Sequence, residues 1–231
     1  MADDSKAETA KASWSEAMRE ARRERIIAAA SEVFHDEGLD GASMRRIATA
    51  AGCTTGAIYP LFKSKEEIYA ELLQRSLSEL ADRLVDAGAG LDRPAERVRA
   101  RAFCILDFYR ERPSDFTISF YLSAGLKRKG VGDELNQILN RQLAELNAIG
   151  LEDMAVCLGE DGVDERSVRE ASSCQDRAEL AASALFAHIT GLLVLELRGR
   201  FNVFAGDART LLERYLDAIF PTTPWPTTSP R

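Results

Sequence analysis

The sequence has few of the residues that build β-sandwiches, metal sites or active sites. Its 231 residues include 15 glycines, 7 prolines, 4 cysteines and 2 histidines. So few turn formers argue against an all-β sandwich. The cysteines lack the paired spacing of zinc ligands, and two histidines leave few options for acid–base chemistry. No HExxH, GxSxG or phosphate-binding loop is present. We therefore expect no enzyme, metal or cofactor.

Long apolar runs are also missing. The most apolar run, residues 181–197, is interrupted by His188 and Glu196, and it looks too short and too polar for a membrane span. The N-terminal sequence MADDSKAETAK has acidic residues and no apolar core, unlike a secretory signal. The formal net charge of -7 argues against a wholly basic nucleic-acid binder but allows a small basic face. We expect a cytoplasmic protein without a membrane partner.

Helical periodicity runs through almost the whole chain. Apolar residues recur three and four apart from Ile26 to Phe34 and from Leu211 to Phe220, and no segment alternates like a strand. We therefore predict an all-α fold of about nine helices.

Local signals predict several helix boundaries. Ser13 and Glu16 fit a capping box, so the first helix should begin there, and Gly38 should end it. Apolar spacing from Leu135 to Leu158 predicts one continuous helix in the C-terminal half.

Two short helices, predicted at 44–51 and 54–62, are joined by a Gly-Cys-Thr turn. Such a pair crosses steeply and needs another helix behind it. The outer face of the second helix carries short or hydrogen-bonding groups that suit a major groove, namely Thr54, Thr55, Gly56 and Tyr59. Gly56 costs about 1 kcal/mol relative to alanine in a helix, and close approach of the backbone to a ligand is a reason to keep it. Geometry alone leaves DNA binding and a purely structural role equally open.

Polar and basic residues surround this pair of helices. Helix N-termini at Ser43-Met44-Arg45 and Ser64-Lys65, with Lys63 beside the second, favour phosphate groups. A further patch contains Arg19, Arg22, Arg23 and Arg25. The alternative for this patch is a solvated helix face in which Glu20 and Glu24 pair with the arginines.

Residues 22–75 resemble the TetR family of bacterial transcription regulators. The resemblance lies in F-x-x-x-G at 34–38, S-M-R-R-I-A-x-x-A-G at 43–52 and T-T-G-A-I-Y-x-x-F-K-S-K-E-E-I at 54–68. It implies a recognition helix carrying Thr54, Thr55, Gly56 and Tyr59, and phosphate contacts at Ser43, Arg45, Tyr59 and Lys65. Two positions depart from the family pattern: Leu61 replaces a common His or Tyr, and Pro60 removes a backbone N–H and should shorten the helix.

The resemblance also implies a domain organisation. Residues 1–18 would be a disordered or helical extension, 19–66 a three-helix helix-turn-helix DNA-binding domain, 67–220 a helical effector-binding and dimerisation domain, and 221–231 a flexible tail.

Two sets of residues in the C-terminal part are candidates for binding. Aromatic and isolated polar groups suggest a small-molecule site made by Phe103, Asp107, Phe108, Phe116, Phe120, Tyr121, His188 and Leu192. Apolar spacing in the last two helices suggests a homodimer interface made by Leu185, Leu195, Leu212, Tyr215, Leu216 and Ile219. The alternative for both sets is packing within one subunit.

The leading functional hypothesis is a dimeric repressor that binds a palindromic DNA operator and is released by a small hydrophobic or aromatic effector. A second hypothesis makes the thiol of Cys53, beside the recognition helix, a redox sensor. A third is an all-α ligand-binding protein that does not bind DNA.

Overall fold

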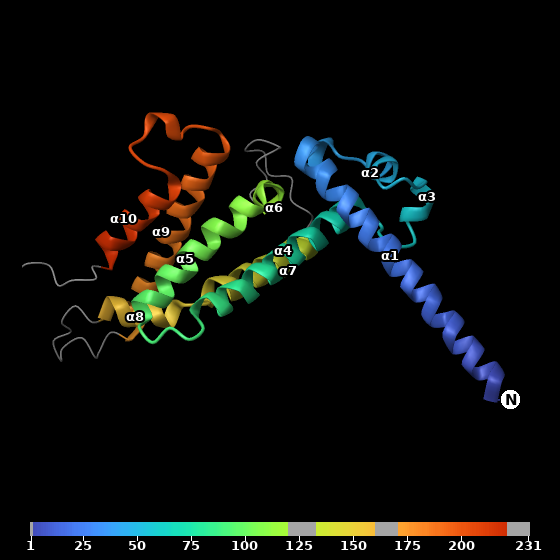
Figure 1. Ribbon diagram of the computed structural model, residues 1–231, viewed down its shortest axis with the longest axis horizontal. Coiled ribbons are helices and arrows are strands. Elements are labelled where there is room, and N and C mark those ends of the chain that lie inside the picture. The colour runs from blue at the N-terminus through green and yellow to red at the C-terminus, as the bar shows by residue number, and fades with distance from the viewer. Residues whose placement is uncertain (1, 120–132, 160–170, 221–231) are drawn as a thin grey trace, which may run out of the picture. The chain divides into compact units, whose positions relative to one another are not determined.

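The chain is helical throughout the part that the structure describes. A computed structural model describes residues 2–119, 133–159 and 171–220. Within these ranges it contains ten α-helices, one 3-10 helix and no strand (Figure 1). The all-α prediction is therefore confirmed. The tail predicted at 221–231 lies outside the described residues.

Two compact units divide the chain. The first contains residues 1–76 and 114–140, and the second contains residues 77–113 and 141–231. The first unit includes α1 (Ala2–Gly41), α2 (Met44–Ala50), α3 (Thr55–Ile58) and all but the first residue of α6 (Pro113–Ser119). The second includes α5 (Pro94–Glu111), α8 (Leu151–Gly159), α9 (Ala171–Leu197), the 3-10 helix η3 (Phe201–Val203) and α10 (Ala208–Ile219). Residues of α4 (Lys65–Gly88) and α7 (Asp133–Ala148) belong to both units.

Aromatic side chains form the centre of the first unit. Phe34 of α1 meets Tyr69 of α4 edge to face, with ring centroids 5.0 Å apart. The Tyr69 hydroxyl donates a hydrogen bond to the carbonyl of Ile118 in α6. Phe62 and Phe116 are at most 1% exposed. The helix-turn-helix segment therefore shares a core with α6, which lies about fifty residues later in the sequence.

The structure corrects the predicted start of the first helix. α1 continues back to Ala2, so the start expected at Ser13 is wrong. The preceding segment, residues 2–12, contains four alanines and two lysines, which extend a helix readily. The predicted end is confirmed, because Gly38 leaves the helical conformation with φ of 67°.

One predicted helix is two helices in the structure. The helix expected through Leu135 and Leu158 is broken between α7 and α8. Gly150 lies at this break with φ of 91°, a conformation that a helix interior does not allow. The apolar spacing continues on both sides of the break, and periodicity alone therefore does not predict the turn.

Helix α5 packs against α8, α9 and α10 in the second unit. Leu106 and Phe108 of α5 are fully buried, as are Ile189 of α9 and Leu212 of α10. Ion pairs flank this core. Arg110 donates hydrogen bonds to both carboxylate oxygens of Glu196 in α9, and Arg99 donates to the carboxylate of Asp217 in α10. Apolar packing and flanking charge pairs thus align the helices of this unit.

A buried carboxylate joins α5 to α8. Asp153, which is 8% exposed, accepts hydrogen bonds from Arg97 (Nε to Oδ1, 2.8 Å) and from Arg101. The hydrogen bond from Arg97, reinforced by Arg101, holds the pKa of Asp153 below its usual range despite the burial. Gly88 and Gly150 leave room for the Arg101 guanidinium, because a Cβ at Gly88 would lie 2.5 Å from its Nη2.

We predict that Asp153→Asn lowers the free energy of unfolding by about 2 kcal/mol at pH 7, since two partly buried guanidinium groups lose a charged acceptor. The folded-state pKa is depressed, so this contribution is complete above about pH 4 and is lost as pH falls through the folded pKa. Denaturant titrations at pH 7 and pH 3 measure the difference, which should shrink in acid. The control Asp217→Asn removes an exposed pair and should cost at most about 0.5 kcal/mol. Equal losses for both variants would contradict the prediction.

Candidate nucleic-acid interface and ligand cavity

The turn between α2 and α3 has the geometry that the sequence predicts. Gly52 adopts φ of 64°, and the amide of Cys53 donates a hydrogen bond to the carbonyl of Ala48 (2.9 Å). Ile47 of α2 and Ile58 of α3 are fully buried. The inner faces of both short helices are therefore fixed by a tight turn and a shared core.

Helix α3 ends early. It spans Thr55–Ile58, with Tyr59 as its C-cap, so the helix stops just before Pro60, whose missing N–H prevents continuation. The predicted helix to residue 62 is thus too long, although Phe62 remains buried. The prediction that Pro60 shortens the helix is confirmed.

The outer face of α3 presents the predicted small and polar groups. Thr54 and Gly56 are exposed, Thr55 is half-buried, and Tyr59 is 54% exposed. A Cβ at Gly56 would have no neighbour closer than 4.0 Å, the Thr54 Oγ1. Packing within the chain therefore does not require glycine at this position.

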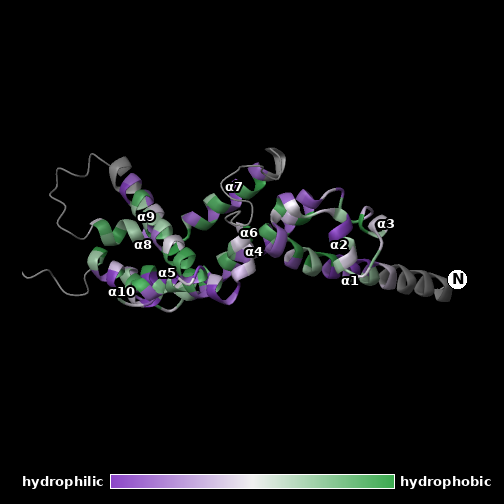
Figure 2. Cartoon of the chain, turned by 90° about the horizontal axis from the view of Figure 1, so that it is seen from above, coloured by the Kyte–Doolittle hydropathy of each residue, from purple (hydrophilic) through white to green (hydrophobic). Residues whose placement is uncertain are grey.

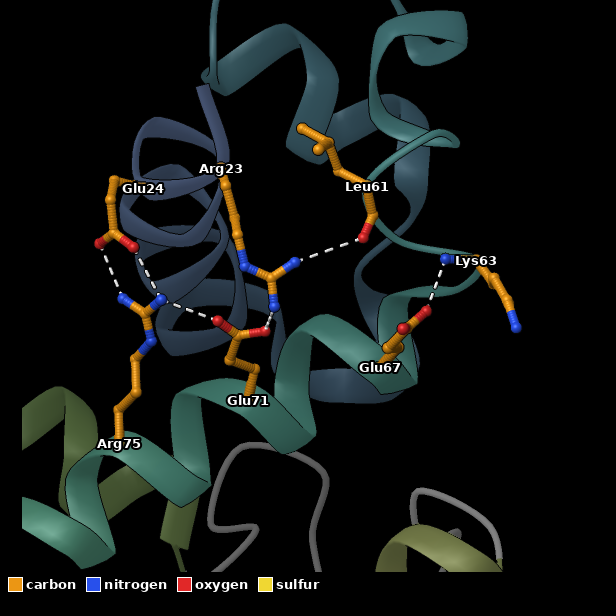
Figure 3. A network of polar contacts seen from close by, with 7 residues as sticks. All are labelled: Arg23, Glu24, Leu61, Lys63, Glu67, Glu71 and Arg75. Atoms are coloured by element: carbon orange, nitrogen blue, oxygen red, sulfur yellow. Dashed lines mark hydrogen bonds and ion pairs between the residues drawn. The ribbon is translucent and has the colours of Figure 1, made fainter. Parts of the chain in front are cut away.

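The residues at the margins of α3 divide into two groups. Ser43 caps α2 by accepting a hydrogen bond from the Arg46 amide (3.3 Å), and Arg45 is exposed beside it. Lys63 is exposed, and its side chain points away from the neighbouring polar contacts in Figure 3. The Lys65 ammonium, in contrast, donates to backbone carbonyls at the end of α1. Three of the four predicted phosphate-side residues are thus exposed, and Lys65 is occupied within the chain.

A polar network ties the end of the helix-turn-helix to α1 and α4 (Figure 3). Arg23 of α1 donates to the carbonyl of Leu61 (3.4 Å) and pairs with Glu71 of α4. The same guanidinium lies 4.6 Å from the centroid of the Phe62 ring, a cation–π distance. Arg75 joins Glu71 to Glu24 of α1 through three hydrogen bonds of 2.7 to 2.8 Å. The segment after α3 is therefore held from two sides.

The four arginines of the predicted basic patch differ in their surroundings because of this network. Arg23 is half-buried and paired, whereas Arg19, Arg22 and Arg25 are exposed. The observed ion pairs differ from the predicted ones, because Arg23 pairs with Glu71 and Glu24 pairs with Arg75. Contact of the exposed arginines with DNA stays a prediction. Only the local i,i+4 pair of Glu71 and Arg75 was visible as a spacing in the sequence, because Arg23 and Glu71 lie 48 residues apart.

A small apolar cavity lies in the second unit. Its volume is about 70 Å³, and its lining includes Leu84 of α4, Ala102 of α5, Met154 of α8 and Phe186 of α9. The guanidinium of Arg101 contributes a polar edge. None of the eight residues that the sequence suggested for an effector site lines this cavity.

The suggested effector residues lie in several places instead. Phe103 and Asp107 both contact Arg209, the ring through a cation–π contact and the carboxylate through a 3.0 Å hydrogen bond. Phe108 is fully buried, with the guanidinium groups of Arg83 and Arg112 at cation–π distances of 5.3 and 4.8 Å from its ring centroid, and Leu192 is buried. Phe116 belongs to the first unit, and Phe120 and Tyr121 lie outside the described residues.

His188 differs from the other suggested residues. Its ring stacks on Tyr215 of α10 with centroids 4.0 Å apart. Burial lowers the pKa of His188, and its buried Nε2 has no hydrogen-bond partner among the described residues. The stacked pair joins α9 to α10.

The suggested dimer residues divide by burial. Leu185, Leu212 and Leu216 are at most 7% exposed within a single chain, and Leu185 also lines the cavity. Leu195, Tyr215 and Ile219 are half-exposed. Packing within the subunit therefore accounts for the first three, and the other three retain surface for a partner.

Helix α9 contains many apolar residues, which are drawn in green in Figure 2. Residues Asp176–Leu197 are long and apolar enough to cross a membrane by length and composition, so the expectation that this run is too short is wrong. That criterion is weak, because core helices of soluble proteins also meet it. Only 22% of the apolar stretch is buried within the chain.

Comparison with known proteins agrees with this arrangement. The family model for bacterial regulatory proteins of the tetR family matches residues 26–72. The HTH-type transcriptional activator FasR of Mycolicibacterium smegmatis is 33% identical over 102 residues, which cover 44% of this chain and 47% of FasR. The nicotine-responsive transcriptional repressor HdnoR of Paenarthrobacter nicotinovorans is 34% identical over 41% of this chain and 47% of its own length. The matched part thus spans about half of each relative.

A solved structure extends the likeness of fold beyond the residues that the family model matches. AibR, solved in complex with isovaleryl coenzyme A and operator DNA, superposes with a TM-score of 0.63. The match covers 87% of this chain and 98% of AibR at 14% sequence identity. At that identity the likeness establishes the fold alone.

Proposed function

The chain belongs to the TetR family of bacterial regulatory proteins, and from this premise we propose that it is a cytoplasmic, dimeric repressor that binds a palindromic DNA operator and is released by a small hydrophobic or aromatic effector. The observation that carries the proposal is the outer face of α3. Thr54, Gly56 and Tyr59 are exposed there while Ile58 is buried beneath them. A short helix with small and hydrogen-bonding groups outward fits the major groove.

The charges around α3 support DNA as the partner. Arg45 and Lys63 are exposed beside α3, and Arg19, Arg22 and Arg25 are exposed along α1. Cations in these positions suit phosphate contacts, which orient a protein on the duplex, while the α3 side chains suit contacts to base edges. We propose direct DNA contacts at Ser43, Arg45, Thr54, Thr55, Gly56, Tyr59 and Lys63.

The surface of α9 supports a homodimer. After the exposed charged residues Asp176, Arg177 and Glu179, the exposed residues of α9 recur three and four apart and are small or apolar as far as Gly191: Leu180, Ser183, Ala184, Ala187 and Gly191. Small residues allow close approach of a second helix, and an uncovered apolar stripe favours burial against another copy. The half-exposed Tyr215 and Ile219 of α10 extend this surface through the His188 stack. A dimer also presents two α3 helices to two related half-sites.

The cavity supports an apolar effector that needs a different conformation. A volume of about 70 Å³ is far below the roughly 300 Å³ or more of typical ligand pockets. An effector must therefore widen the cavity, and it binds better to the widened conformation. Such differential affinity is what a ligand needs to shift an equilibrium away from the DNA-binding state. AibR, whose structure contains isovaleryl coenzyme A, suggests acyl thioesters as the first compounds to test.

We predict that Gly56→Ala lowers operator affinity at least tenfold without destabilising the protein. An added methyl has space in the free chain and raises helix propensity by up to about 1 kcal/mol, but it separates the backbone from DNA. Fluorescence anisotropy on a duplex recovered by the wild-type protein from a random-sequence pool measures affinity, and thermal melting measures stability.

The control Gly159→Ala adds a methyl at the end of α8, also in open space, and should change neither affinity nor stability. Wild-type affinity in Gly56→Ala would contradict close backbone approach, and failure of the wild-type protein to recover any duplex would contradict DNA binding.

We predict that Ala187→Glu converts the dimer into a monomer, because it places a charge in the exposed stripe of α9. Sedimentation velocity should show the monomer mass, and operator affinity should fall. Ala144→Glu, the same change at an exposed position of α7, should leave the dimer intact. A monomeric wild-type protein, or a dimeric Ala187→Glu variant, would exclude this interface.

We predict that Ala102→Leu abolishes effector binding while operator binding persists, because the larger side chain fills the cavity. Thermal shift against fatty acids and short-chain acyl thioesters is the assay, and a ligand at 100 times its Kd should stabilise the wild-type protein by about 2.7 kcal/mol. His188→Gln serves as the control and should keep the response. The reverse pattern would assign effector binding to the residues suggested by the sequence.

A further inference from the structure

Lys65 begins α4, yet its ammonium group lies at the end of α1. The Nζ atom donates to the carbonyl oxygens of Leu39 (2.7 Å) and Ala42 (2.8 Å), with the Asp40 carbonyl at 3.4 Å. A lysine ammonium has three N–H donors and no acceptor. The three carbonyls are therefore acceptors for the three N–H donors of this side chain.

These carbonyls need such a partner. The last carbonyls of a helix have no partner within it and carry partial negative charge. Gly38 turns the chain out of the α1 helix, and Leu39 and Ala42 are buried, so water has little access to them. A cation supplied by α4 satisfies the carbonyls and matches their charge.

The position of the bonded carbonyls links three helices. Ala42 directly precedes Ser43, the N-cap of α2, and α2 leads through the Gly52 turn into α3. Lys65 belongs to the first turn of α4, which Ser64 and Glu67 fix by capping: the Glu67 amide donates to Ser64 Oγ (3.2 Å) and the Lys63 amide donates to Glu67 Oε2 (2.6 Å). The ammonium thus joins α4 to the point where α1 passes into α2.

We propose that Lys65 is a positioning residue that locks the start of α4 to the end of α1, and so holds α2 and α3 in the orientation that binds DNA, without itself neutralising a phosphate. The proposal rests on the proposed function for its DNA-binding consequence, although the contact itself exists in the free protein. It assigns the phosphate contact at this edge to Lys63, which is exposed two residues earlier.

The salt dependence of operator binding separates the two roles. Each phosphate contact that a lysine makes contributes about 0.9 to the slope of log K against log salt concentration. Lys65→Met should weaken binding at least tenfold at every salt concentration with the wild-type slope. The matched variant Lys63→Met should make the slope shallower by about 0.9 per lysine removed. A shallower slope for Lys65→Met, or its wild-type affinity, would overturn the proposal.

A second variant decides the case if Lys65→Met does not fold. Lys65→Arg keeps the positive charge, but a planar guanidinium cannot direct three donors from one nitrogen toward converging carbonyls. A phosphate contact predicts near wild-type affinity for Lys65→Arg, which would overturn the proposal. The locking role predicts a loss of at least threefold at an unchanged slope.

Amide exchange in the absence of DNA tests the contact independently of the proposed function. The amide of Ala42 bonds to the Gly38 carbonyl and that of Arg46 to Ser43 Oγ. Both amides should exchange at least tenfold faster in Lys65→Arg, and also in Lys65→Met if that variant folds. Their exchange rates should not change in Lys63→Met. If the wild-type protein recovers no duplex, the proposed function fails while this measurement still decides the role of Lys65. Unchanged exchange in the folded variants would show that Lys65 locks nothing.

Discussion

A helix of four residues cannot be stable by itself, and contacts within the first unit hold α3 in place. Isolated helices shorter than about twelve residues are marginal in water, and α3 spans only Thr55–Ile58. Its stability therefore comes from burial of Ile58 and Phe62 and from the turn at Gly52. Arg23 adds a polar contact to the Leu61 carbonyl immediately after the helix. The surrounding residues therefore hold α3 in place through packing and hydrogen bonds, and helix propensity contributes little.

The charge distribution follows from the same constraint. The whole chain carries a formal net charge of -7, so most of its surface repels DNA, and a small cationic face can orient the approach. Arg23, Arg46 and Lys65 are used inside the unit, where they bind Glu71, Glu37 and backbone carbonyls. Each cation used for holding α3 is one fewer available to phosphates.

The sequence predicted those parts that depend on neighbouring residues. Caps at Ser43 and Ser64, the Gly38 and Gly52 turns and the early stop at Pro60 are local, and the structure contains all of them. The break at Gly150 was missed because apolar spacing continues across it. The contacts of Lys65 with Leu39 and of Arg23 with Glu71 span 26 and 48 residues. No periodicity in one sequence encodes such pairs, so only the folded chain could show that Lys65 faces inward.

Residues of one helix, α4, belong to both units. Leu84 near the end of α4 lines the cavity, and Lys65 at its start binds the carbonyls that precede α2. Because α4 is continuous from Lys65 to Gly88, the coupling that the proposed function requires between effector and DNA would run along this helix. In the proposed mechanism the coupling is reciprocal, so operator DNA would oppose effector binding by the same free energy with which the effector opposes DNA binding. The small size of the cavity thus follows naturally if this conformation is the one that binds DNA.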